Sequence, residues 1–183
     1  MSDIRVLLDT NIFISREAEQ VIPEDLQQLL KTLGTLNVQV LLHPSSIEDL
    51  KRDKETARRR VQLSKLDAYA HLASPPSCDT DIAFLAVVGK TTRPNDKVDN
   101  DLLYAISRNA ADLLVTEDKG IIKKASWLGL SDRVLGILDA RVLFGEMLPH
   151  EIVDATPLII HCPVHNLDIN DPFFDARQIP RNS

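Results

Sequence analysis

Cysteine is scarce in this sequence, and long apolar runs are absent from it. Only two of the 183 residues are cysteines, Cys78 and Cys162, so a disulfide framework is excluded and both are expected to be reduced thiols. No apolar stretch approaches the roughly 20 residues that span a bilayer, so we expect no membrane helix. A strand expected within a few residues of Met1 leaves no room for a signal peptide. These features together predict a cytoplasmic protein.

Positive charge is also in short supply. The chain carries 21 Lys and Arg against 27 Asp and Glu, a formal net charge of −6, which argues against a general nucleic-acid-coating protein. One basic segment stands out, and most of it is expected to be a solvated helix face. If nucleic acid is the substrate, its phosphates should dock on this segment, which contains Lys51, Arg52, Lys54, Arg58, Arg59, Arg60 and Lys65.

The remaining composition suits a single globular domain. Hydrophobic residues make up 44% of the chain and charged residues 26%, enough for a core that needs no disulfides. Strand-like and helix-like segments alternate, which is typical of parallel βαβ units. The segment 81–88 fits either a helix or a strand. Strands are expected over 4–8, 38–42, 112–116 and 134–138, and helices over 23–33, 46–73, 94–109, 121–128 and 139–147.

The end of the chain differs from the rest in its proline content. Half of the ten prolines lie beyond residue 148, with an apolar patch at 158–160 among them. We therefore expect a folded domain over 1–148. The remainder, 149–183, is expected to be an extended tail that packs against this domain and then frays.

Acidic residues stand at separated points beside the expected strand ends and helix starts. Asp9 follows the first strand, Glu48 follows the second, and Asp118 follows the strand at 112–116. In an open α/β sheet the carboxyl ends of the strands converge on one crevice. Carboxylates gathered there raise one another's pKa values unless a cation lies among them. The pattern therefore predicts a site for Mg²⁺ or Mn²⁺, and all-carboxylate metal sites are typical of phosphate chemistry.

Each of these acids also has an ordinary structural interpretation. Asp9 could form an Asx turn, and Asp118 could cap the next helix. Glu48 could close a capping box with Ser45.

A second box is possible around Glu48, because Ser46 and Asp49 have the same spacing as Ser45 and Glu48. That box would leave Glu48 facing the crevice. Lys51, Arg52 and Arg59 follow Glu48 at helical offsets, so the same face would carry positive charge for a phosphate backbone.

The acid that the helix at 94–109 contributes is ambiguous among Asp96, Asp99 and Asp101. The residues at helical offsets from Asp99 are all apolar, whereas those from Asp101 are mixed. We therefore predict that Asp99 points inward as the metal ligand. Asp101 borders the same face and is expected to assist.

These features resemble the PIN-domain ribonucleases: Asp-Thr-Asn after the first strand, a Ser-x-x-Glu helix start, an inward Asp on a later helix, and Leu-Val-Thr-Glu-Asp at a strand end. The resemblance covers about 4–147. It implies a Rossmann-like three-layer sandwich with a central parallel sheet, and endonucleolytic cleavage of single-stranded RNA. It also implies that Mg²⁺ or Mn²⁺ is held by Asp9, Glu48, Asp99 and Asp118, with Thr10 or Asn11 orienting the substrate.

The mechanism expected from this resemblance uses two metal ions about 3.5–4 Å apart. One ion would activate water for in-line attack, and the other would stabilise the leaving 3′ oxygen. The segment 167–175 is similar to the joint into an acetyltransferase domain in some PIN fusions, which suggests a partner of that type. An antitoxin and a homodimer are further partners that the resemblance suggests.

Other protein classes fit the acidic pattern less well. A haloacid-dehalogenase-type phosphatase needs a second Asp at the position of Asn11. A response-regulator receiver needs an acidic pair after the first strand and a phosphorylatable Asp at the end of the third strand, and neither is evident in this sequence. A non-catalytic PIN-fold module would keep the basic helix and bind RNA or a protein without any metal dependence.

Overall fold

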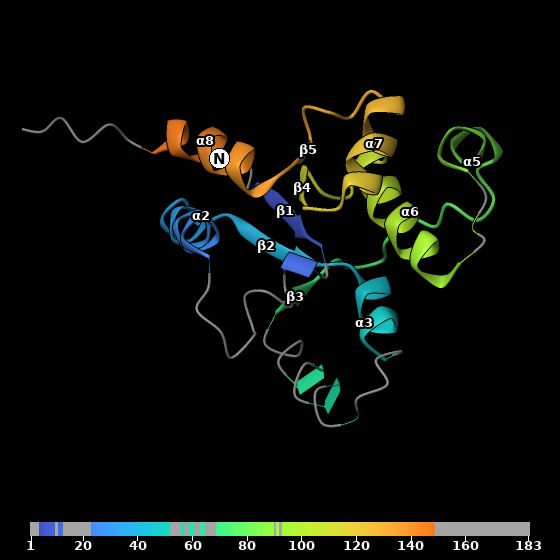
Figure 1. Cartoon of the computed structure of the whole chain (residues 1–183), viewed down its shortest axis with the longest axis horizontal. Helices are drawn as coiled ribbons and strands as arrows, with labels where there is room; N and C mark the ends of the chain where they lie inside the picture. Colours follow the sequence, from blue (N-terminus) through green and yellow to red (C-terminus); the bar gives the residue numbers. More distant parts are fainter. Residues whose placement is uncertain are drawn as a thin grey trace, which may run out of the picture. The chain divides into compact units, whose positions relative to one another are not determined.

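A five-stranded parallel sheet forms the centre of the molecule. The structure is a computed structural model that describes residues 4–9, 11–12, 23–51, 56, 59–60, 63–64, 69–89, 91 and 93–148. The sheet order is β3-β2-β1-β4-β5 (Figure 1). Its strands are Arg5–Leu8 (β1), Gln39–Leu42 (β2), Ala70–His71 (β3), Leu113–Val115 (β4) and Val134–Leu135 (β5). The helices are Glu24–Thr35 (α2), Pro44–Lys51 (α3), Ile82–Val88 (α5), Pro94–Ser107 (α6), Lys119–Trp127 (α7) and Ile137–Met147 (α8).

Helices cover both faces of this sheet, as the alternation of strand side chains requires. Leu7 is paired in register with Leu41 and Leu114, and all three pack into the core that also contains α5, α6 and α7. Leu8 is paired with Leu42 and packs with α2 and α8 on the opposite face. The predicted α/β class with a parallel sheet and helices on both faces is therefore confirmed.

The order of the strands reverses at β1. From β1 the chain adds β2 and β3 on one side, then crosses to the other side to add β4 and β5 (Figure 1). In open parallel sheets ligands bind outside the carboxyl ends of the strands at such a switch point. The residues that follow β1 and β4 therefore border the expected crevice.

Several predicted boundaries are wrong. The helix expected to run to residue 73 is interrupted, because Ala70–His71 forms β3 beside β2. A two-residue edge strand with exposed side chains carries no periodic signal. The strand expected to reach residue 138 ends at Leu135, and the next helix begins at Ile137. The ambiguous segment 81–88 is helical as α5.

Some expectations fall on parts of the chain that the structure does not describe. The proline-rich tail, 149–183, lies outside the described residues, as do Thr10 and Arg52. Within the described residues, none of the helices has the length and apolar character needed to cross a membrane.

Candidate active site at the carboxyl ends of β1 and β4

Asp9 lies at the end of β1 and is only 4% exposed. Its Oδ2 accepts a hydrogen bond of 2.7 Å from the hydroxyl of Thr116, the first residue after β4. The same hydroxyl oxygen accepts a bond of 3.0 Å from the backbone N–H of Asp118. The buried Thr116 therefore joins the two strand exits and orients the Asp9 carboxylate between them.

Thr116 was not predicted as a site residue. The only local signal was a hydroxyl two residues before Asp118, a spacing that is common in side-chain turns. Its partner Asp9 is 107 positions away in the sequence, so no local pattern could assign that bond.

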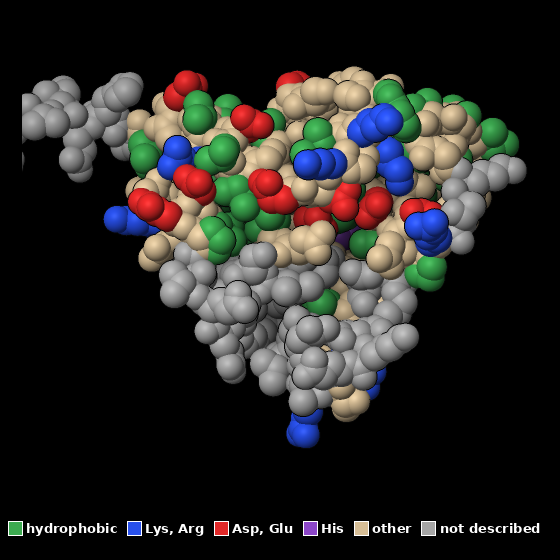
Figure 2. Space-filling model, in the orientation of Figure 1, with side chains coloured by type: hydrophobic (Ala, Val, Ile, Leu, Met, Phe, Trp, Pro, Cys, Tyr) green, Lys and Arg blue, Asp and Glu red, His purple; other side chains and the backbone are tan. Residues whose placement is uncertain are grey.

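Asp99 lies on α6 and belongs to the same electrostatic cluster. Burial raises its pKa from 3.8 to about 6, and the charges of Asp118, Asp9 and Asp96 add to this rise. Lys124 on α7 acts in the opposite direction, with its Nζ 3.9 Å from Asp99 Oδ2. Asp and Glu side chains gather near the middle of the face shown in Figure 2. The charges of Asp9 and Asp118, which follow β1 and β4, thus act on Asp99 of α6.

Lys124 is held beside Asp99 by a neighbouring side chain. Its Nζ donates a bond of 3.0 Å to Oδ1 of Asn100, which is buried on α6. The ammonium group is therefore a positioned positive charge at the border of the acidic cluster. Sequence reasoning missed both residues, because neither follows a strand end.

Asp118 caps a helix, which is the structural interpretation that the sequence also allowed. It is the N-cap of α7, and its Oδ1 accepts bonds of 2.6 Å from Gly120 N–H and 3.1 Å from Ile121 N–H. Since the same carboxylate raises the pKa of Asp99, capping does not remove it from the crevice. The two bonds instead hold one oxygen in place.

Two helical glycines, Gly120 and Gly145, should respond differently to replacement by alanine, because only Gly120 lies against the capping carboxylate of Asp118. A Cβ at Gly120 would lie 2.9 Å from Asp118 Oδ1, whereas a Cβ at Gly145 on α8 would meet nothing within 4 Å. Alanine in a helix interior gains about 1 kcal/mol over glycine, and losing a cap costs about as much. We expect Gly145→Ala to raise the free energy of unfolding by about 0.5–1 kcal/mol, and Gly120→Ala to leave it unchanged or lower. Urea unfolding of both variants measures the difference, and equal gains would contradict the capping geometry.

Glu48 is not gathered into this cluster by any described contact. Its side chain is 66% exposed and pairs with Lys51 one turn later, with 2.9 Å between Lys51 Nζ and Glu48 Oε1. The predicted capping box with Ser45 is wrong, because α3 begins at Pro44 and Ser45 makes a different bond. The second predicted box, with Ser46 as its N-cap, is wrong for the same reason, because Ser46 lies inside α3 and its hydroxyl has no hydrogen-bond partner in the described part of the chain.

The basic segment is described only in part. Lys51 is exposed at the end of α3, and Arg59 and Arg60 are also described. Arg52 and the other basic residues of that segment are not, so RNA docking there stays a prediction.

Asp101 belongs to a second polar cluster, between α3 and α6. It is 5% exposed, and its Oδ2 accepts a bond of 2.6 Å from the Ser45 hydroxyl. Its Oδ1 accepts from Cys78 Sγ at 3.5 Å and lies 3.6 Å from Lys97 Nζ. Burial, together with the charge and hydrogen bond of Asp101, raises the pKa of Cys78 to about 11. This thiol is therefore un-ionised at neutral pH.

The apolar neighbours of Asp99 at helical offsets do not distinguish it from Asp101. Apart from Asp99, α6 is buried from Val98 to Ile106, so nearly every side of it faces protein. Asp101 is in fact more buried than Asp99, whose side chain is 27% exposed. What separates the two is their surroundings: Asp99 meets the acids at the strand ends, and Asp101 meets Ser45 and Cys78.

His43, at the end of β2, borders the Asp101 cluster. Its pKa is lowered by burial, which outweighs the opposing effect of Asp101. Its Nδ1 accepts a bond of 3.1 Å from Ser45 N–H. Its Nε2 and the hydroxyl of Ser46 are buried and have no hydrogen-bond partner in the described part of the chain. His43 is thus a neutral side chain within the protein.

The donor atoms of the acidic cluster are suited to a hard divalent cation. Asp9, Asp99 and Asp118 offer only carboxylate oxygens, which Mg²⁺ and Mn²⁺ prefer. In their present positions no three Asp, Glu, His or Cys side chains of the described residues lie close enough to share one ion. Burial is the main cause of the raised pKa of Asp99, and the charges of Asp118, Asp9 and Asp96 add to it against the opposing charge of Lys124. A bound cation would favour the ionised form of this carboxyl group.

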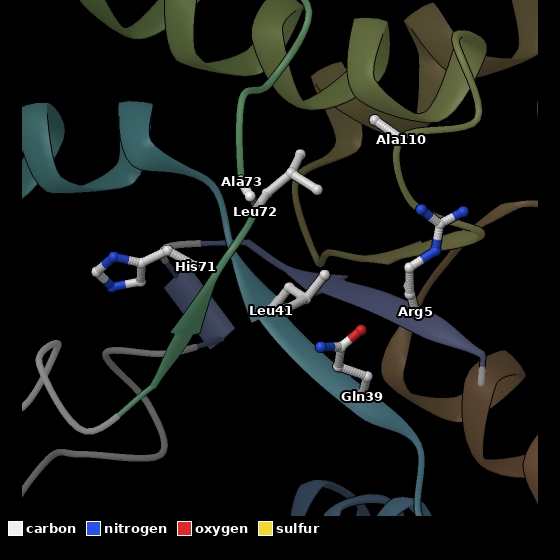
Figure 3. A pocket seen from close by; sticks show the side chains of 7 residues that line it. All are labelled: Arg5, Gln39, Leu41, His71, Leu72, Ala73 and Ala110. Carbon is white, nitrogen blue, oxygen red and sulfur yellow. The ribbon is translucent and has the colours of Figure 1, made fainter.

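A separate cavity of about 270 Å³ lies against the sheet, lined by residues of β1, β2 and the segment 71–73. Arg5 and Gln39, the first residues of β1 and β2, line it together with Leu41 and His71 (Figure 3). Arg5 is occupied there by an ion pair with Asp112, 3.2 Å between their charged atoms. None of the carboxylates of the crevice lines this cavity.

The fold and the crevice together define a class. The chain is an α/β protein with an all-parallel five-stranded sheet, consistent with a Rossmann-like sandwich, and an acidic cluster lies at its topological switch point. No family model, curated protein or solved structure matches this chain.

Proposed function

We propose that this chain is a PIN-like endoribonuclease that cleaves single-stranded RNA with Mg²⁺ or Mn²⁺. One observation carries the proposal. Asp9, Asp99 and Asp118 come from three separate elements, yet the charges of Asp9 and Asp118 act on Asp99 and raise its pKa to about 6 together with burial. An acidic cluster at the ligand-binding edge of a parallel sheet is suited to holding cations against a phosphate.

Each residue of the cluster has a definable part in this proposal. Asp9, Asp99 and Asp118 would hold the divalent ions, which supply an activated water and stabilise the negative charge of the phosphate. Thr116 keeps Asp9 oriented through its hydroxyl. Asp99 is ionised for the most part above pH 6, which is the form that binds a cation.

The proposal also includes Glu48 and the basic segment, which the structure supports less directly. Glu48 remains a predicted fourth ligand and would have to leave Lys51 to join the others. Lys51 and Arg59, with Arg52, would dock the RNA backbone, and the exposed Lys51 at the end of α3 is compatible with that part.

The test is cleavage of end-labelled single-stranded RNA by the full chain with Mn²⁺, with Mg²⁺ and with excess chelator. We expect internal cuts that leave 3′-hydroxyl and 5′-phosphate ends, that need the metal, and that are absent for Asp99→Asn. Asp132→Asn is the matched control, because it makes the same change at an exposed turn. Cleavage that continues in chelator would reject the proposal.

A second candidate is a non-catalytic module that binds RNA or a protein partner. Lys124 beside Asp99, the capping bonds of Asp118 and the Glu48–Lys51 pair favour it, because each engages an acid without a metal. In the same assay this module would bind the RNA by fluorescence anisotropy, equally with metal and with chelator, and would not cut it.

A further inference from the structure

A cavity of about 360 Å³ lies between the exit of β1 and the starts of α2 and α8. Asn11, two residues after Asp9, and Glu117, next to Asp118, both line it. The loops that carry the crevice residues therefore also form walls of the cavity. An RNA strand bound over Asp9 and Asp118 would therefore pass next to this cavity. Its volume is within the range of roughly 300–1,000 Å³ common for small-molecule pockets.

The lining is apolar with an acidic rim. Ile12, Pro23, Leu26 and Leu138 provide aliphatic surface, and Leu138 is 56% exposed. The charged groups among the described lining residues are Asp25 and Glu117, and both are negative.

The acidic rim keeps its capacity to accept hydrogen bonds. Glu117 Oε1 accepts a bond of 2.6 Å from Ile137 N–H at the start of α8, which fixes the carboxylate while its second oxygen can still accept. Asp25 Oδ1 pairs with Arg141 at 2.8 Å, which likewise leaves Asp25 Oδ2.

This chemistry discriminates between the parts of an RNA strand. The Glu117 carboxylate repels a phosphate, and the charge of Asp25 is offset in part by its ion pair with Arg141, so the strand's backbone is disfavoured chiefly on the Glu117 side of the cavity. An unpaired base is flat, uncharged and able to pack on aliphatic side chains. Its edge groups can then bond to the carboxylates.

We propose that this cavity binds the base of a nucleotide flanking the scissile phosphate, and that it favours bases with an exocyclic amino group. Adenine, cytosine and guanine can donate from that group to Glu117 or Asp25. Uracil can donate only from N3–H, which lies between two carbonyl oxygens that a carboxylate repels. The inference rests on the proposed function for the position of the scissile phosphate, but the base preference itself requires no cleavage.

The experiment measures binding with Ca²⁺ in place of Mg²⁺ and Mn²⁺, so that the acids can hold a hard cation while cleavage is suppressed, and repeats it in excess chelator. Short labelled oligoadenylate, oligocytidylate and oligouridylate are titrated with the full chain and followed by fluorescence anisotropy. We expect the wild-type chain to bind the first two more tightly than oligouridylate. Leu138→Trp fills the cavity from its exposed side and should weaken oligoadenylate binding about tenfold, the scale of one lost base contact.

Two further variants separate the cavity from its surroundings. Val142→Trp adds the same bulk one turn later on α8, at a side chain that is 57% exposed and does not line the cavity, and should leave binding unchanged. Glu117→Gln keeps an acceptor for Ile137 N–H but loses the negative charge. It should therefore reduce the difference in binding affinity between oligoadenylate and oligouridylate. Thermal unfolding of all variants confirms that they are folded.

The outcomes distinguish this inference from the proposed function. Equal binding of the three oligonucleotides, or equal effects of Leu138→Trp and Val142→Trp, would overturn the cavity assignment even if the chain cuts RNA. A base preference that Leu138→Trp removes would uphold it, even if Mn²⁺ produces no cleavage.

Discussion

Asp9→Asn should lower the rate of RNA cleavage by about 10²–10³-fold or more, the usual scale for losing one group that stabilises transition-state charge. The variant keeps the shape of the side chain, and its amide oxygen can still accept from the Thr116 hydroxyl. The fold is therefore expected to survive, and the loss can be assigned to the missing negative charge. Single-turnover cleavage with saturating Mn²⁺ measures the effect without interference from product release.

The matched control for Asp9→Asn is again Asp132→Asn, which removes one carboxylate from an exposed turn. It should cleave at the wild-type rate. Wild-type cleavage by Asp9→Asn itself would show that the carboxylate at the end of β1 takes no part in the reaction, and the nuclease proposal would fail.

Asp99→Asn should stabilise the chain in a pH-dependent way when chelator is present. The pKa of Asp99 is raised from 3.8 to about 6 in the folded state, by burial and by its acidic neighbours. Between these values the native chain retains a proton that the unfolded chain has lost, so stability falls as pH rises through this window. Below it the carboxyl group is neutral in both states and the variant should gain nothing from this source.

The size of this effect follows from the shift. We expect the free energy of unfolding of Asp99→Asn, relative to wild type, to increase by about 2 kcal/mol from pH 4 to pH 7. Urea unfolding across this range measures the increase. A difference that stays constant with pH would show that Asp99 is not in a negatively charged, buried setting.

Metal binding gives the same experiment a second arm. At neutral pH Mn²⁺ should stabilise the wild-type chain, by about 2.7 kcal/mol at a hundred times its dissociation constant. Asp99→Asn should gain much less, because a ligand is missing and the repulsion is already relieved. An equal gain in both proteins would place the Mn²⁺ site elsewhere.

The strand ends were the most predictable part of the site. Residues 6–8 of β1 and all of β4 are short apolar runs buried on both faces, and a continuous run of hydrophobic residues can be recognised in a sequence. The amino-acid pattern alone therefore places Asp9 and Asp118 at strand exits. The α/β class followed from the alternation of the segments.

Other site features were not predictable for a physical reason. The bond between Thr116 and Asp9 and the proximity of Lys124 to Asp99 each join different elements. β3 pairs with β2 although its two residues carry no pattern of their own. These pairings depend on how the helices and strands pack against one another. They could not be predicted from the sequence, because hydrophobic periodicity indicates only which side of an element is buried.

The amino-acid sequence by itself determined the class of fold, the position of most helices and strands, and which acids follow the central strands. The tertiary structure decided which acids meet. It brought Asp99 within reach of the charges of Asp9 and Asp118, gave Asp101 hydrogen bonds from Ser45 and Cys78, and left Glu48 on the surface with Lys51. The reason is that α6 is buried on nearly every side, so the helical period could not tell which of its acids faces the crevice. Only the packing of α3 and α7 against α6 separates the two.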